Sequence, residues 1–161
     1  MFHLPITGYL NLFDNQLSGP LPLRLGLREL SFLDLGRNNF TGPLPSDWWT
    51  GGDSLVRLRH LFLDHNQFTG VLPDEFPEIG GGRLNQLTMA FNDFEGVFPG
   101  SWDPINKLVA LEIQGNRFTR FGNNFCRMVV FNWGELVSLR SDCSMCSCGE
   151  PLCARSVCLA D

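Results

Sequence analysis

Residues 61–73 read LFLDHNQFTGVLP, a phrase of two leucines around one residue, then an asparagine, then a Phe-x-Gly-x-Leu-Pro segment. The same phrase, of the form L-x-L-x-x-N-x-[LF]-x-G-x-[LF]-P, begins again at Leu10, Leu33 and Leu87, and a shorter copy without the glycine and proline begins at Leu111. The copies start 23, 28, 26 and 24 residues apart. A period in this range is typical of repeat proteins, so the chain is predicted to contain five copies of one structural unit.

Each position of the phrase has a physical reason. The alternating leucines point to one side of a short strand and are buried between neighbouring coils. The asparagines are predicted to form a ladder, because an amide both donates to and accepts from backbone groups of adjacent coils: Asn15, Asn38, Asn66, Asn92 and Asn116. An apolar spine is predicted inside the stack: Leu17, Phe40, Phe68, Phe94 and Phe118.

Two further features complete the predicted coil. Insertions at Gly51–Gly52 and Gly80–Gly82 lengthen loops and leave the phrase intact. An apolar residue lies three positions after each proline and is expected to anchor a short helical or 3-10 turn: Leu25, Trp48, Phe76 and Trp102. No single coil can bury its own leucines, so stability must come from stacking.

The phrase resembles the leucine-rich repeat family, specifically the extracellular type common in plant receptor-like proteins, over about residues 7–122. The resemblance implies an α/β solenoid with a parallel sheet on a concave face. It also implies a second short strand near the L-x-G segment, short helical or 3-10 turns on the convex side, and recognition of peptides or proteins.

The cysteines are confined to the last quarter of the chain: Cys126, Cys143, Cys146, Cys148, Cys153 and Cys158. Because a solenoid exposes an apolar end unless something covers it, residues 1–122 are predicted to form the repeat array and residues 123–161 a disulfide-stapled cap. Within this tail, residues 134–143 are predicted to contain one further strand. The pairing of the cysteines stays open. A zinc site is the alternative, but the two separated Cys-x2-Cys pairs of a strong zinc motif are missing, so no metal is predicted.

The tail also bears on the source and the compartment. Its Phe-Cys pair, strand, Ser-Asp-Cys and terminal cysteines are similar to the ends of diatom and other algal leucine-rich repeat proteins. An even set of cysteines favours an oxidising compartment, and Asn39-Phe40-Thr41 is a glycosylation sequon. The first residues do not resemble a signal peptide, so we expect a fragment of an extracellular or cell-surface protein. A cytosolic protein with reduced thiols is the alternative.

The charge and the motifs exclude several classes of function. A net charge of −5 with only 18% charged residues argues against nucleic acid and against an anionic membrane surface. No apolar stretch is long enough to span a membrane. The histidines His3, His60 and His65 accompany no catalytic motif, and Gly80–Gly82 lacks the lysine of a phosphate loop. We therefore predict no enzyme activity and no cofactor.

The residues between the leucines are predicted to face outward and to carry the function. Aromatic rings lie beside acids in the first three copies, and such rings are frequent binding anchors. The predicted ligand-binding residues are Tyr9, Phe32, Asp34, Arg37, His60, Phe62, Asp64, His65, Thr88 and Glu112. Phe13 and Phe91, near the strand ends, either join this face or tuck partly inward.

We therefore predict a non-catalytic recognition module of a receptor-like protein. It would bind a peptide or protein carrying positive charge on the N-terminal half of the concave face. The alternatives are a secreted inhibitor of a wall-degrading hydrolase, or the recognition part of a receptor-like kinase whose catalytic domain lies outside this chain. The sequence leaves the oligomeric state open.

Overall fold

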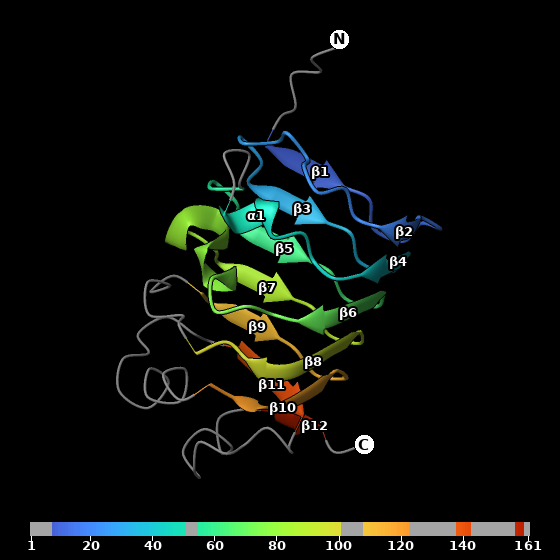
Figure 1. The fold of residues 1–161 in the computed structure, drawn as a ribbon, viewed down its shortest axis with the longest axis vertical. Helices are drawn as coiled ribbons and strands as arrows, with labels where there is room; N and C mark the ends of the chain where they lie inside the picture. The colour runs from blue at the N-terminus through green and yellow to red at the C-terminus, as the bar shows by residue number, and fades with distance from the viewer. Residues whose placement is uncertain (1–7, 51–54, 101–107, 123–137, 143–156, 160–161) are drawn as a thin grey trace.

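The computed structural model describes residues 8–50, 55–100, 108–122, 138–142 and 157–159, and they form a solenoid with two parallel sheets (Figure 1). The strands of the first sheet follow one another in the order of the chain: β1 (Tyr9–Asn11), β3 (Phe32–Asp34), β5 (His60–Phe62), β7 (Gln86–Thr88), β9 (Ala110–Glu112), β11 (Ser138–Asp142) and β12 (Val157–Leu159). The second sheet follows the L-x-G segments: β2 (Ser18–Pro20), β4 (Asn39–Gly42), β6 (Gln67–Val71), β8 (Asp93–Phe98) and β10 (Arg117–Phe121). The predicted α/β solenoid with a second short strand in each coil is confirmed.

The register of the first sheet aligns the repeats residue by residue. Leu10 pairs with Leu33, Leu33 with Leu61, and the pairing continues through Leu87 and Leu111 to Leu139. From Leu33 onward these leucines are buried in one continuous core. Because side chains alternate along a strand, the residues on either side of each leucine share the opposite face and lie in straight columns.

The asparagine ladder is present and joins each coil to the one before it. The Asn66 amide nitrogen donates to Leu63 O of its own coil at 3.1 Å and to Leu35 O of the preceding coil at 2.9 Å. Its Oδ1 accepts from the Phe40 N–H at 3.0 Å. Asn38, Asn92 and Asn116 repeat this pattern. The Asn15 side chain donates only within its own coil, in the first coil that the structure describes.

The apolar spine is confirmed from the second coil onward. The rings of Phe40 and Phe68 lie nearly parallel with centroids 6.0 Å apart, and those of Phe94 and Phe118 follow in the same way. Leu17 differs from the prediction because it is 39% exposed. Leu17 lies directly before β2, which among the described residues is a terminal strand of the second sheet and pairs with β4 alone, so one side of Leu17 lacks a neighbouring coil.

Two short helical segments lie on the side opposite the second sheet (Figure 1). They are α1 (Asp47–Thr50) and η1 (Phe76–Gly82). Trp48 and Phe76 are buried, as the predicted anchors should be, and Leu25 is partly buried. Helices are few among the described residues, where most of the regular structure is β-strand. Trp102 and Gly51–Gly52 lie outside the described residues.

The Gly80–Gly82 insertion packs against the preceding coil. All three glycines have positive φ, and the Gly80 N–H donates to Leu55 O at 3.0 Å. A Cβ on Gly80 would lie 2.4 Å from Leu58 O, so the close approach of the two backbones requires glycine. The predicted loop is therefore a fixed part of the coil.

The tail is described only in part. β11 supplies the further strand predicted within residues 134–143 and pairs in parallel with β9 and β12. The predicted cap and its alternative zinc site lie outside the described residues, because the side chains of all six cysteines do. Among the helices of the described residues, none is long and apolar enough to cross a membrane.

Candidate ligand-recognition face

The outward face of the first sheet collects most of the predicted binding residues in three columns. The column before the buried leucines contains Tyr9, Phe32, His60, Gln86, Ala110 and Ser138. The column after them contains Asn11, Asp34, Phe62, Thr88, Glu112 and Arg140. Two residues further along each coil, a third column contains Phe13, Gly36, Asp64, Ala90 and Gln114. The repeat spacing thus places residues that are more than 20 positions apart in direct lateral contact.

Four rings in the first three coils form one cluster, here called the aromatic cluster: Tyr9, Phe32, His60 and Phe62. Tyr9 stacks on Phe32 with ring centroids 4.2 Å apart. Phe32 lies 5.9 Å from the His60 ring and 5.4 Å from the Phe62 ring. Tyr9 is 55% exposed and the other three are partly exposed. The cluster therefore presents ring surface to solvent while its members support one another.

Two carboxylates lie beside the aromatic cluster, at a position where the chain has a glycine. A Cβ on Gly36 would lie 3.2 Å from Asp34 Oδ1, 3.2 Å from Asp64 Oδ1 and 3.3 Å from the Phe13 ring. Asp34 accepts a hydrogen bond from the Gly36 N–H, and Asp64 accepts one from the Thr88 hydroxyl at 2.8 Å. We call Asp34 and Asp64 the acid pair. Glycine lets both carboxylates approach the same point of the face.

The two negative charges of the acid pair repel each other. Burial raises the pKa of Asp34 above its ordinary value, the hydrogen bond from Gly36 opposes this rise, and the negative charge of Asp64 adds to it. A positive charge placed between the two carboxylates would reverse the last contribution. The face is therefore chemically suited to an ammonium or guanidinium group.

A further column lies beside the strands and has an unusual backbone. Asp14, Arg37, His65 and Phe91, each just before a ladder asparagine, all have φ between 52° and 57°. Their N–H groups hold this left-handed conformation by donating to the following coil, as in Arg37 to Asp64 O at 2.9 Å. The Arg37 guanidinium lies 5.7 Å from the Phe13 ring, and His65 stacks on Phe91 at 4.6 Å. Among the described residues, Arg37 and His65 thus make their ring contacts with Phe13 and Phe91 and not with the aromatic cluster.

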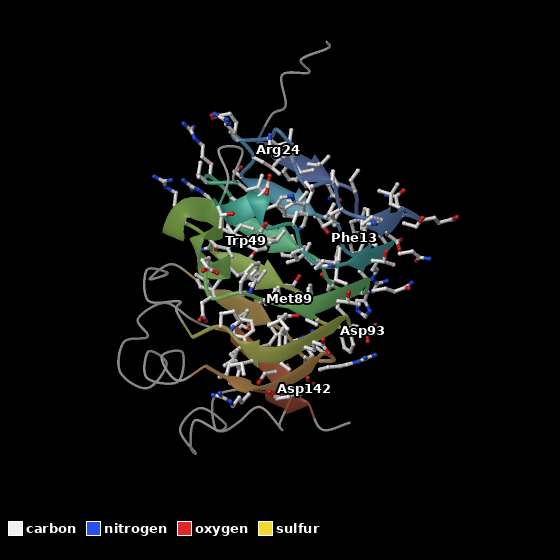
Figure 2. All side chains as sticks on the ribbon, viewed as in Figure 1. Phe13, Arg24, Trp49, Met89, Asp93 and Asp142 are labelled. Carbon is white, nitrogen blue, oxygen red and sulfur yellow. The ribbon has the colours of Figure 1, made fainter. Side chains whose placement is uncertain are left out.

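Phe13 and Phe91 belong to the exposed face. They are 43% and 46% exposed, so the inward-tucked alternative is wrong for both. Figure 2 labels Phe13 beyond the ends of the first-sheet strands, toward the second sheet. The predicted site omitted both residues because they follow the strands and the period-2 pattern no longer fixes their direction. Their place two and one positions before the asparagine was the signal that could have found them.

The C-terminal half of the face is different in chemistry. Glu112 lies 3.7 Å from the Arg140 guanidinium, and Asp142 accepts from the Gly115 N–H at 2.9 Å. Thr88 is linked to the acid pair by its hydrogen bond to Asp64. The contact of Glu112 is with Arg140 instead. Among the described residues, no three His, Cys, Asp or Glu side chains lie close enough together to hold a metal ion.

The comparisons with known proteins agree with the solenoid. The leucine-rich repeat family model matches residues 29–50 and 57–79. The chain is 36% identical over 112 residues to Pollen receptor-like kinase 2 of Arabidopsis thaliana, an alignment that covers 68% of this chain and 16% of the kinase. The chain is a leucine-rich repeat protein. Its repeats are of the plant extracellular type.

The solved structures that resemble this leucine-rich repeat solenoid include two receptor ectodomains with bound ligands. One is the plant peptide hormone receptor RGFR1 in complex with RGF2, with a TM-score of 0.68, 31% identity, and coverage of 83% of this chain and 20% of the receptor. The other is the ectodomain of the Arabidopsis thaliana receptor kinase GASSHO1/SCHENGEN3 in complex with CASPARIAN STRIP INTEGRITY FACTOR 2. It has a TM-score of 0.70, 28% identity, and coverage of 83% of this chain and 15% of that one. The chain therefore spans a small part of its relatives, and the matched ectodomains support a non-catalytic module.

Proposed function

We propose that this leucine-rich repeat array is the ligand-recognition module of a receptor-like protein at the cell surface or outside the cell. Its ligand would be a peptide or protein that places a basic side chain against the acid pair and apolar surface against the aromatic cluster. The observation that carries the proposal is the contact of four aromatic rings with each other, beside two carboxylates, on one exposed face. The resemblance to ectodomains with bound ligands supports it.

The energetics favour this part of the face. Aromatic side chains offer large contact area at a low cost in conformational entropy, and binding hot spots are rich in them. The rings are already held by mutual stacking, so little further ordering is needed on binding. A cation beside Asp34 and Asp64 would gain from two carboxylates at once, and the apolar neighbours lower the local dielectric constant. The negative charges of the two carboxylates explain why a basic ligand would be preferred over an acidic one.

The direct test is selection from a random peptide library displayed on phage, with the full chain as bait. We expect enriched peptides to contain arginine or lysine next to apolar residues. The variant carrying Phe32→Ala, Phe62→Ala and Asp64→Asn should bind an enriched peptide about 100-fold more weakly or worse, because hot-spot residues each contribute about 2 kcal/mol or more. Fluorescence anisotropy with that labelled peptide measures the loss.

A matched control removes two exposed apolar side chains and one acid elsewhere: Leu23→Ala, Val71→Ala and Glu95→Gln. This control should bind the peptide like the natural chain. Both variants should keep the natural thermal midpoint within a few degrees. Equal affinity of the first variant and the natural chain would refute the assigned face, even if some other surface binds the peptide.

The domain boundaries are part of the same proposal. Residues 1–122 would form the recognition array and residues 123–161 a disulfide-stapled cap. The continuation of the first sheet into β11 and β12 supports a tail that extends the stack. Mass spectrometry of the non-reduced, alkylated chain tests it: labelled free thiols at all six cysteines of protein secreted from a eukaryotic host would overturn the disulfide cap.

A further inference from the structure

A second polar feature lies at the opposite ends of the strands from the acid pair. An open pocket of about 340 Å³ is lined by Arg59, His60, Arg83 and Asn85, at the points where the chain enters β5 and β7. Its volume is within the range of pockets that hold small ligand groups. We propose that this pocket, here called the arginine pocket, binds an anionic oxygen group of the ligand: a carboxylate, sulfate or phosphate. The inference rests on the proposed function and adds a second recognition point to it.

The two guanidinium groups have no acidic partner among the described residues. Arg24, Arg57, Arg117 and Arg140 each lie within 4 Å of a carboxylate, as in Arg57 and Glu29 at 2.8 Å. In that part of the chain no such contact occurs at Arg59 or Arg83, and both side chains are exposed. Two like charges that face one pocket without a counter-charge favour an anion. Arginine is the side chain best suited to hold one, because its planar fork donates two parallel hydrogen bonds.

The pocket is also preformed. The Arg83 guanidinium donates to Val56 O at 3.3 Å, which restrains its long side chain. The backbone of Arg59 is held on both sides: its N–H donates to Ser31 O at 2.8 Å, and its carbonyl accepts from the Asn85 N–H at 2.7 Å. The residues that would bind the anion therefore come from adjacent, hydrogen-bonded coils. Restraint of this kind lowers the entropic cost of binding.

His60 connects the arginine pocket to the aromatic cluster. It lines the pocket, its Nδ1 lies 3.1 Å from Gln86 Oε1, and its ring stacks along Phe62 at 6.4 Å. From Arg59 to Asp64 the chain advances five residues, which span at most about 16 Å of extended backbone at roughly 3.3 Å per residue. The face thus carries positive charge at one end of the strands, rings in the middle and negative charge at the other end. This order predicts a ligand with an anionic group at one end and a basic group at the other.

The test titrates three probes into the isotope-labelled full chain at constant ionic strength set with chloride: sodium sulfate, sodium phosphate and N-acetylglycine. NMR of the arginine Nε–H groups and of the backbone amides follows the binding. We expect saturable shifts at Arg59 and Arg83 with at least one probe. Tighter binding of sulfate and phosphate than of N-acetylglycine would indicate a tetrahedral oxyanion, and the reverse a carboxylate.

A double variant makes the test specific. Arg59→Gln with Arg83→Gln should weaken the tightest probe about tenfold or more, because charge-assisted hydrogen bonds are lost. The matched control Arg24→Gln with Arg117→Gln removes two arginines already paired with carboxylates, and it should bind like the natural chain. Non-saturable shifts with all three probes, or equal binding by the double variant, would overturn the proposal.

The outcome is separable from that of the peptide experiment. If the face binds no peptide but an anion still saturates the arginine pocket, the proposed function is refuted and the anion site is retained. Peptide binding to the face without saturable binding of any of the three anions would support the proposed function and refute the arginine pocket.

Discussion

The two halves of the first sheet share one backbone and differ in what they show to solvent. In the first three coils the outward positions carry Tyr9, Phe32 and Phe62, whose rings contact one another, and the acid pair, whose members both approach Gly36. In the following coils the equivalent positions carry small or uncharged side chains, together with Glu112, which is close to Arg140. The leucine register and the asparagine ladder are the same in both halves. Stability is therefore repeated in each coil, whereas recognition depends on side chains that the repeat leaves free.

The largest expected effect concerns the scaffold that both halves share. Asn66→Ala removes two donors to the preceding and own coils and leaves the Phe40 N–H without its acceptor. We expect a loss of about 3 kcal/mol in the free energy of unfolding, because partly buried backbone groups of two coils would lose their partners. Asn15→Ala should cost less than about 1 kcal/mol, since the Asn15 side chain is exposed and donates only within its own coil. Urea denaturation followed by circular dichroism measures both, and equal losses would contradict the ladder as the joint between coils.

The next effect separates the halves at two rings of nearly equal exposure. Phe13→Ala should weaken binding of the selected basic peptide about tenfold, because Phe13 borders the acid pair. Phe91→Ala should change it less than about threefold, because Phe91 stacks on His65 and borders Gly115, whereas Phe13 borders Gly36 between the two carboxylates. Isothermal titration calorimetry with the same peptide compares them. A larger loss for Phe91→Ala would move the proposed site to the C-terminal half.

A smaller effect tests the glycine between the carboxylates. Gly36→Ala introduces a methyl group 3.2 Å from an oxygen of each member of the acid pair, so the carboxylates must separate. We expect binding of the basic peptide to weaken about fivefold and stability to fall by about 1 kcal/mol. Ala90→Gly, the reverse change in the same column of the fourth coil, should leave binding unchanged. Unaltered affinity of Gly36→Ala would show that the two carboxylates do not act together.

The smallest effect is the pH dependence that Asp34 contributes. Burial raises its pKa in the folded chain, so between its unfolded and folded pKa values the native state binds more protons. Stability from this group is therefore present at low pH and is lost as the pH rises through the raised pKa. The stability of Asp34→Asn relative to the natural chain should therefore be greater at pH 7 than at pH 3. Chemical denaturation at both pH values checks this, and a difference that stays constant would contradict the raised pKa.

The predicted fold needed little beyond the repeat. The ladder at Asn38 and Asn66, the spine at Phe40 and Phe68 and the strand near residue 138 were all predictable, because each follows from one phrase copied at fixed offsets. The candidate face was predictable as a set of outward positions. Its contacts were not: the acid pair joins residues 30 positions apart, and Phe13 follows its strand. The arginine pocket was missed because Arg59 and Arg83 lie before the strands, in segments of unequal length.

The repeated phrase alone was enough to specify a stack of coils, because burial of regularly spaced leucines and pairing of buried amides leave one arrangement of low free energy. The lateral register then decided which outward residues meet. Tyr9 touches Phe32 and Asp34 approaches Asp64 only after the coils are aligned and Gly36 leaves room between them. The same alignment brings Arg59 and Arg83 to one pocket. The spacing of these residues along the chain does not predict such contacts, because hydrogen bonds between coils set the distances.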